Sequence, residues 1–133
     1  MVRSLSIRRS LILPQIYPAA GGVVLYSLVS SNPAVDGQVI LTDPTDPTKM
    51  PAIGIVVRVF GDGRVLIEGR KGTLVTNSGW SWTRGNTLWA DPATPGGLFE
   101  QVAAPPTTGE MQRVGQAASA TSIVMGITRE IVL

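Results

Sequence analysis

The segment Ile53–Glu68, with the sequence IGIVVRVFGDGRVLIE, decides the fold. Arg58 alternates with Val57 and Val59 on one side of its centre, and Val65 and Ile67 share one face on the other. Such alternation is typical of a strand with one buried face. The centre is Gly61-Asp62-Gly63, and glycine supplies the positive φ angle that a tight hairpin loop demands. The segment therefore predicts a β-hairpin of Ile53–Phe60 and Arg64–Glu68.

Further short apolar runs, each bounded by glycine, proline or asparagine, lie on both sides of this hairpin. Their regular spacing favours a sandwich or a barrel. We predict an all-β protein, a compact antiparallel β-sandwich or β-barrel (β-tulip-like) with an extended N-terminal arm. No internal repeat is clear enough in the sequence to be identified. The further strands are predicted at Val23–Val29, Gln38–Thr42, Thr73–Thr76, Trp80–Thr83, Asn86–Ala90, Leu98–Val102, Gln112–Ala118, Ser122–Ile127 and Glu130–Leu133.

The composition argues against catalysis. A length of 133 residues with 44% hydrophobic residues is enough for one domain with a real core. The chain has no cysteine and no histidine, which excludes disulfides and thiolate metal sites and removes the commonest metal ligand and general base. A serine nucleophile would have to pair with Lys49 or Lys71, and both lie in predicted loops. We expect no catalytic residue, no metal and no cofactor.

The first 22 residues are predicted to form the arm, and residues 23–133 a single β domain. Pro14, Pro18 and the Gly21-Gly22 pair suit an extended segment better than a helix. The arm contains Arg3, Arg8 and Arg9, whereas the first acidic residue of the chain is Asp36. The arm is thus the one basic region that stands out.

Membranes and nucleic acids are not expected partners. A net charge of +2 is too small to imply nucleic-acid binding. No stretch approaches the roughly 20 apolar residues of a membrane span. The apolar run that ends at Pro14 is also shorter than the hydrophobic region of a secretory signal. We expect a soluble protein.

The tryptophans are candidate binding residues. Trp80 and Trp82 would face the same side of a strand and, with Trp89, would offer a stacking platform for sugar rings. The alternative is packing in the core or at a subunit interface, where large aromatic side chains contribute most. We favour packing, and a carbohydrate-binding module is an alternative function class that rests on these residues alone.

Two kinds of loop invite a ligand interpretation. Asp43 and Asp46 would suit calcium, which binds carboxylate oxygens, but each precedes a proline, and we expect both to cap turns. The glycine-bounded segments 61–63 and 69–72 would suit a phosphate only if a helix followed. Strands are predicted to follow, so we interpret both segments as hairpin turns.

Several short motifs occur in a fixed order from Met50 to the C-terminus. They are MPAIGIV (Met50–Val56), WTRGNTLW (Trp82–Trp89), PGGL (Pro95–Leu98), the pair Pro105-Pro106 and QRVGQA (Gln112–Ala117). In this order they resemble small β modules of tailed-bacteriophage virions, which occur in capsid decoration proteins and in tail or head fibres.

This resemblance implies a bacteriophage virion structural protein. The expected function is that of a capsid decoration (cement) protein, a homotrimer on the capsid surface that binds the outside of the major capsid protein lattice and stabilises the head. The alternative is a tail-fibre or head-fibre module for host receptor adhesion, which usually carries a coiled-coil shaft that this chain lacks. The arm would meet the lattice or a neighbouring subunit by strand addition, unless it is a tail without a role in binding. The arm residues expected at this interface are Arg3, Arg8, Arg9, Leu11, Leu13 and Tyr17.

Overall fold

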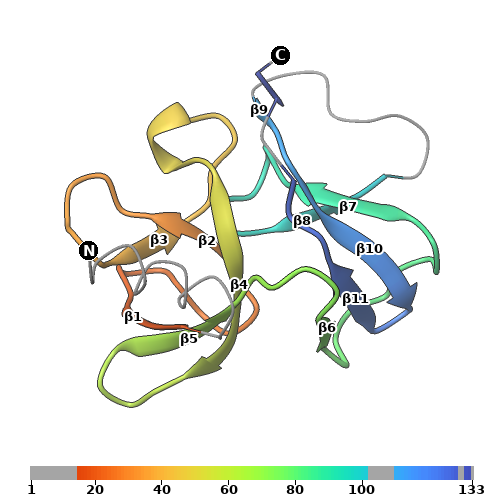
Figure 1. Ribbon diagram of the computed structural model, residues 1–133, viewed down its shortest axis with the longest axis horizontal. Coiled ribbons are helices and arrows are strands. Elements are labelled where there is room, and N and C mark those ends of the chain that lie inside the picture. Colours follow the sequence, from red (N-terminus) through yellow and green to blue (C-terminus); the bar gives the residue numbers. More distant parts are fainter. Residues whose placement is uncertain (1–14, 102–109, 129–130, 133) are drawn as a thin grey trace, which may run out of the picture.

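The computed structural model describes residues 15–101, 110–128 and 131–132. These residues form two five-stranded antiparallel sheets that pack against each other, and a separate pair of strands (Figure 1). The predicted all-β sandwich is therefore confirmed. The elements are β1 (Gln15–Pro18), β2 (Leu28–Ser31), β3 (Val39–Leu41), the 3₁₀-helix η1 (Pro47–Lys49), β4 (Ala52–Val59), β5 (Arg64–Glu68), β6 (Leu74–Thr76), β7 (Thr87–Ala90), β8 (Leu98–Glu100), β9 (Glu110–Met111), β10 (Arg113–Ser119), β11 (Ser122–Met125) and β12 (Ile131–Val132).

The predicted hairpin is β4 and β5, which pair antiparallel with Val56 opposite Ile67. Two other predicted strands are wrong in part or in whole. Val23–Ser27 precedes β2 as a turn, because Tyr26 has a φ angle of 68° that no strand residue adopts. Trp80–Thr83 is also not a strand: the Trp80 N–H donates to the Asn77 carbonyl within a turn.

The N-terminal arm is described only from residue 15 onwards. Residues 1–14 lie outside the described part of the chain. Gln15–Pro18 is the edge strand β1, which pairs with β5 from Gln15 opposite Ile67 to Pro18 opposite Arg64. These four residues of the expected arm thus belong to the first sheet.

The two five-stranded sheets are two copies of one module. The first sheet has the strand order β1-β5-β4-β2-β3, and the second has the order β6-β11-β10-β7-β8. The strands therefore correspond one to one in both sequence order and sheet position: β1 to β6, β2 to β7, β3 to β8, β4 to β10, and β5 to β11. We call the first sheet module 1 and the second module 2.

The pairing registers of the two modules coincide. In module 1, Val29 lies between Gly54 on β4 and Leu41 on β3. In module 2, the counterpart residues are Leu88, Gly115 on β10 and Glu100 on β8. The β-bulges coincide as well, since the β4–β5 pairing shifts between residues 56 and 58 and the β10–β11 pairing between residues 117 and 119.

The turns after β2 and β7 have the same hydrogen bonds. In module 1 the Ala34 N–H donates to the Asn32 side chain (2.9 Å), and in module 2 the Ala93 N–H donates to the Asp91 side chain (2.8 Å). Gly37 and Gly96 then take positive φ angles of 74° and 76°, which glycine adopts without steric cost. The motif Asn/Asp-Pro-Ala-x-x-Gly is the sequence signal of the duplication, at residues 32–37 and 91–96.

Module 1 closes around its own core. After β1, Ala19 forms a parallel bridge with Val39, and the Ala20 N–H donates to the Val39 carbonyl (2.9 Å), so the first edge of the sheet meets the last. The enclosed apolar cluster consists of Val29, Val39, Val56, Val65 and Ile67, with Tyr17, Ala19, Val23 and Ile53 packed against it.

Module 2 does not close in this way within the described residues. After β6, the backbone N–H of Trp82 donates to the Ala120 carbonyl in the β10–β11 turn (2.8 Å), and no bridge joins this segment to β8. The inner face of module 2 is covered by module 1 instead. Leu28 and Ile55, on the outer face of module 1, are fully buried in one cluster with Leu88, Val114 and Ile123 of module 2. The outer face of module 1 thus packs against the inner face of module 2, an arrangement that we call head to tail.

Polar groups fix this junction. Gln112, only 2% exposed, accepts the Ala52 N–H at Oε1 (2.6 Å) and donates from Nε2 to the Thr128 carbonyl (3.0 Å). The Gly96 N–H donates to the Thr42 carbonyl (2.7 Å), and the Leu28 N–H donates to the Gly96 carbonyl (2.8 Å). Satisfied buried polar groups of this kind specify one arrangement of the two modules.

Candidate interaction surfaces

Most of the arm residues expected at an interface lie outside the described residues: Arg3, Arg8, Arg9, Leu11 and Leu13. Tyr17 is described. It lies on β1 opposite Val65, is half-buried, and packs against the core of module 1. Its ring helps to hold the edge strand on the sheet, and its contact with a partner stays a prediction.

Trp80 and Trp82 lie at the junction of the two modules. Both are half-buried and pack against the shared core. The Trp80 ring is 5.6 Å from that of Trp82 and 5.4 Å from that of Tyr26, with interplanar angles of 43° and 56°. Tilted rings at these distances are typical of packed aromatic clusters.

Trp89 is separate from this cluster. Its neighbour Leu88 points into the shared core, so Trp89, one residue along the strand, points to the opposite face of module 2. It lies between Phe99 and Arg113 across the sheet, and its Nε1 donates to Gln101 Oε1 (3.0 Å). The three tryptophans therefore do not share one face, and a single sugar platform made of all three is not formed.

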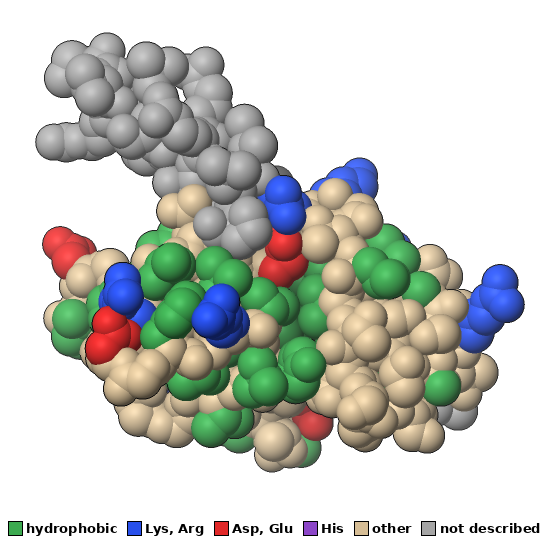
Figure 2. Space-filling view, turned by 90° about the horizontal axis from the view of Figure 1, so that it is seen from below, with side chains coloured by type: hydrophobic (Ala, Val, Ile, Leu, Met, Phe, Trp, Pro, Cys, Tyr) green, Lys and Arg blue, Asp and Glu red, His purple; other side chains and the backbone are tan. Residues whose placement is uncertain are grey.

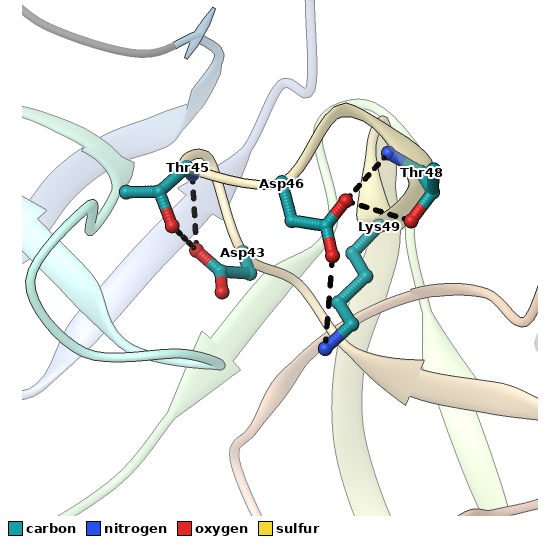
Figure 3. Close-up of polar contacts among 5 residues, drawn as sticks. All are labelled: Asp43, Thr45, Asp46, Thr48 and Lys49. Atoms are coloured by element: carbon teal, nitrogen blue, oxygen red, sulfur yellow. Dashed lines mark hydrogen bonds and ion pairs between the residues drawn. The ribbon is translucent and has the colours of Figure 1, made fainter.

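Asp43 and Asp46 each cap a turn (Figure 3). The Asp43 carboxylate accepts the Thr45 N–H (3.0 Å) and hydroxyl (2.7 Å), and Asp46 accepts the same two groups of Thr48 at the same distances. The hydroxyl and then the N–H of Thr48 lower the pKa of Asp46 below its ordinary value. In the described residues no three acidic side chains gather where they would hold a metal ion.

Both glycine-rich segments are turns. Segment 61–63 is the turn of the β4–β5 hairpin, as predicted, but segment 69–72 connects β5 of the first sheet to β6 of the second, so its interpretation as a hairpin turn is wrong. Gly63 and Gly72 have positive φ angles of 86° and 85°, and strands follow both. Arg70 is held within the second turn. Its Nε and Nη2 donate to the Glu68 carboxylate (3.1 and 2.9 Å), and Glu68 is only 5% exposed. These side-chain hydrogen bonds lower the pKa of Glu68.

A surface that sequence reasoning missed lies on the outer face of module 1. Ile16, Leu66 and Arg58 are directly opposite one another on β1, β5 and β4. Phe60 and Arg64 follow at the end of the hairpin, where the Phe60 N–H donates to the Arg64 carbonyl (2.9 Å). We call these five residues the Arg–Phe face. Figure 2 views the side on which the β4–β5 hairpin lies, and hydrophobic side chains gather there with charged ones among them.

No family model matches this chain, and no curated protein and no solved structure is similar to it at a significant level. The described part of the chain contains no helix with the length and apolar character needed to cross a bilayer.

Proposed function

We propose that this protein is a bacteriophage virion structural protein, namely a capsid decoration protein that binds the outer surface of the major capsid protein lattice as a homotrimer. The support is the ordered set of motifs that resembles virion β modules. MPAIGIV (Met50–Val56) leads into β4 and QRVGQA (Gln112–Ala117) into β10, and β4 and β10 are the same strand of the two modules. These two motifs thus occupy equivalent strands of the two modules.

The architecture is compatible with a role in assembly. In a decoration protein the useful features are a rigid body and surfaces that fit a repeating partner. The shared core and the Gln112 hydrogen bonds join the two modules into such a body. A tail-fibre or head-fibre module that meets a host receptor is the second candidate, since the same motifs occur in both classes.

Localisation in the virion separates the candidates. We would determine the copy number of the protein in purified particles by quantitative mass spectrometry and find its density by electron microscopy. Many copies spread over the shell are expected. A few copies at the tail would establish the fibre role, and absence from the particle would overturn both candidates.

The arm is tested by truncation. Residues 1–14 should be deleted rather than residues 1–22, because Tyr17 and Ala19 pack against the core of module 1 and their loss would unfold it. We expect the truncated protein to remain folded but to lose occupancy on undecorated particles. Light scattering shows whether the trimer forms without the arm. Normal assembly and normal occupancy would mean that the arm has no attachment role.

A further inference from the structure

The outer face of the first sheet has apolar residues on β1, β2, β4 and β5, but module 2 covers only some of them. Leu28 and Ile55, on β2 and β4, are fully buried against module 2. On the same face, towards β1, Ile16 is 47% exposed and Leu66 is half-buried. Among the described residues nothing covers the Arg–Phe face, which therefore continues the surface of module 1 that module 2 packs against.

Module 2 shows that the fold does not require these side chains. The counterparts of Ile16, Leu66 and Arg58 are Thr76, Ser122 and Ser119, in the same register on β6, β11 and β10. There the row is polar, and the hydroxyls of Ser119 and Ser122 bond each other (2.6 Å). The apolar and basic row of module 1 is thus an addition to the module.

The hairpin of module 1 is also longer than its counterpart. Residues 59–65 connect Arg58 to Leu66, whereas only Ala120 and Thr121 connect Ser119 to Ser122. Of these two connections only the longer one has charged residues, Asp62 and Arg64.

Two arginines frame one aromatic ring on this loop. The guanidinium carbons of Arg58 and Arg64 lie 5.0 and 5.6 Å from the centroid of the Phe60 ring. Asp62 binds Arg64 through Nε (2.7 Å), which leaves the terminal nitrogens of that guanidinium for other acceptors. Contact with an aromatic ring orients a guanidinium without using its hydrogen-bond donors.

The positive charge of the two arginines indicates the chemistry of the partner. Arginine pairs in a bidentate way with carboxylates, and arginine and aromatic residues are enriched at the centres of protein interfaces. The arm that enters at β1 contains only basic charges, so it does not complement this face. Nucleic acid is disfavoured because Asp62, bound to Arg64, adds a negative charge, and because Ile16 and Leu66 offer nothing to a phosphate backbone.

We propose that the Arg–Phe face is a docking surface for a carboxylate-bearing protein segment, whose acidic side chains bind Arg58 and Arg64 and whose apolar side chains cover Ile16 and Leu66. This surface includes none of the arm residues 1–14. The proposal also does not depend on the virion assignment, because it concerns only the chemistry of the partner.

The test is an NMR titration of the full-length, ¹⁵N-labelled protein with a peptide of alternating glutamate and leucine residues. The key variant carries I16T, R58S and L66S, which gives module 1 the row of module 2 and is expected to fold. The control variant R84S loses the same charge at an exposed position in module 2. A duplex DNA oligonucleotide serves as the second probe.

We expect the peptide to shift the amide signals of the Arg–Phe face in the intact protein and in R84S. The triple variant is expected to bind the peptide at least about tenfold more weakly, which corresponds to a loss of about 1.4 kcal/mol of binding free energy. Equal peptide binding by the triple variant, or peptide shifts elsewhere, would overturn the proposal. DNA that binds at this face as tightly as the peptide would also overturn it. Concentration-dependent shifts at this face without any probe would identify a second copy as the occupant and would equally contradict the proposal.

Discussion

Tyr26 and Gly85 occupy the same position in the two modules, and both have positive φ angles, 68° and 91°. Each donates its N–H to the counterpart carbonyl of the facing strand, Val56 (2.7 Å) and Ala117 (2.8 Å). The module therefore needs a left-handed residue here. Glycine meets this need freely, whereas a residue with a Cβ pays about 1–2 kcal/mol. The tyrosine offsets this cost through its contact with Trp80.

The first prediction concerns this position. Y26A removes the ring but keeps the strain, and Y26G removes both. We expect Y26G to be more stable than Y26A by about 1 kcal/mol, the reverse of the usual ranking outside turns. Urea unfolding of both variants measures the difference. Equal stability of Y26A and Y26G would show that the backbone at residue 26 is not strained. G85A is the matched variant in module 2, because it introduces a Cβ at the equivalent left-handed position.

The second prediction concerns the two glycines of the duplicated strand. A Cβ on Gly54 would meet Ile67 and the Glu68 carbonyl oxygen (2.7 Å), and one on Gly115 would meet the Val124 carbonyl oxygen and Ile123 (2.9 Å). We expect G54A and G115A each to lower the free energy of unfolding by about 2–3 kcal/mol, because backbone atoms cannot move aside.

The matched control for these glycines is G61A, since a Cβ at Gly61 meets open space. Its effect is expected to stay within about 0.5 kcal/mol. Thermal unfolding of the three variants tests the expectation, and similar melting temperatures for all three would contradict it.

The third prediction separates packing from sugar binding at the tryptophans. Trp80 and Trp82 pack against the shared core, so W80A and W82A are expected to cost up to about 3–5 kcal/mol each. A sugar platform would instead leave stability unchanged and abolish glycan binding. Calorimetry and a glycan array on both variants distinguish the outcomes, and unchanged melting in both would refute packing.

The fourth prediction concerns pH. Hydrogen bonds from Arg70 lower the pKa of Glu68 below 4.5 in the folded state, so the unfolded state takes up the proton first as the solution is acidified. The stability from this pair is fully present above about pH 4.5 and is lost as the pH falls through the folded pKa. E68Q is expected to be less stable than the intact protein by about 1–2 kcal/mol at pH 7.

Chemical unfolding between pH 7 and pH 3 provides the measurement. The stability difference between the intact protein and E68Q should shrink towards acidic pH. D62N serves as the comparison, because the pKa of Asp62 is also lowered by Arg64 but its side chain is exposed. A difference that stays constant with pH would rule out the role of the Glu68 charge.

The hairpin could be predicted from the sequence because its signals are local: alternation and a glycine turn lie within one short segment. Sequence reasoning missed the duplication, because its one sequence signal is the short Asn/Asp-Pro-Ala-x-x-Gly motif and the modules otherwise share register rather than side chains. Gly54 and Gly115 correspond, as do Asn32 and Asp91, but Val56 corresponds to Ala117. Trp80–Thr83 has the composition of a strand, yet tertiary contacts with the β10–β11 turn decide its path.

The capping roles of Asp43 and Asp46 could also be predicted, because each carboxylate bonds to a residue two positions along the chain. The Arg–Phe face could not be predicted. Ile16 is exposed only because module 2 stops short of β1, and no sequence pattern shows how far one module reaches over another.

The head-to-tail contact gives the two modules unequal independence. Module 1 has its own closed core, whereas the core of module 2 includes Leu28 and Ile55 of module 1. Ribosomal synthesis delivers the N-terminal module first. The module with a core of its own is therefore made first, and it provides a surface on which the second module completes its core. If the order of the two modules in the chain were reversed, module 2 would be synthesised before Leu28 and Ile55 of module 1, which complete its core.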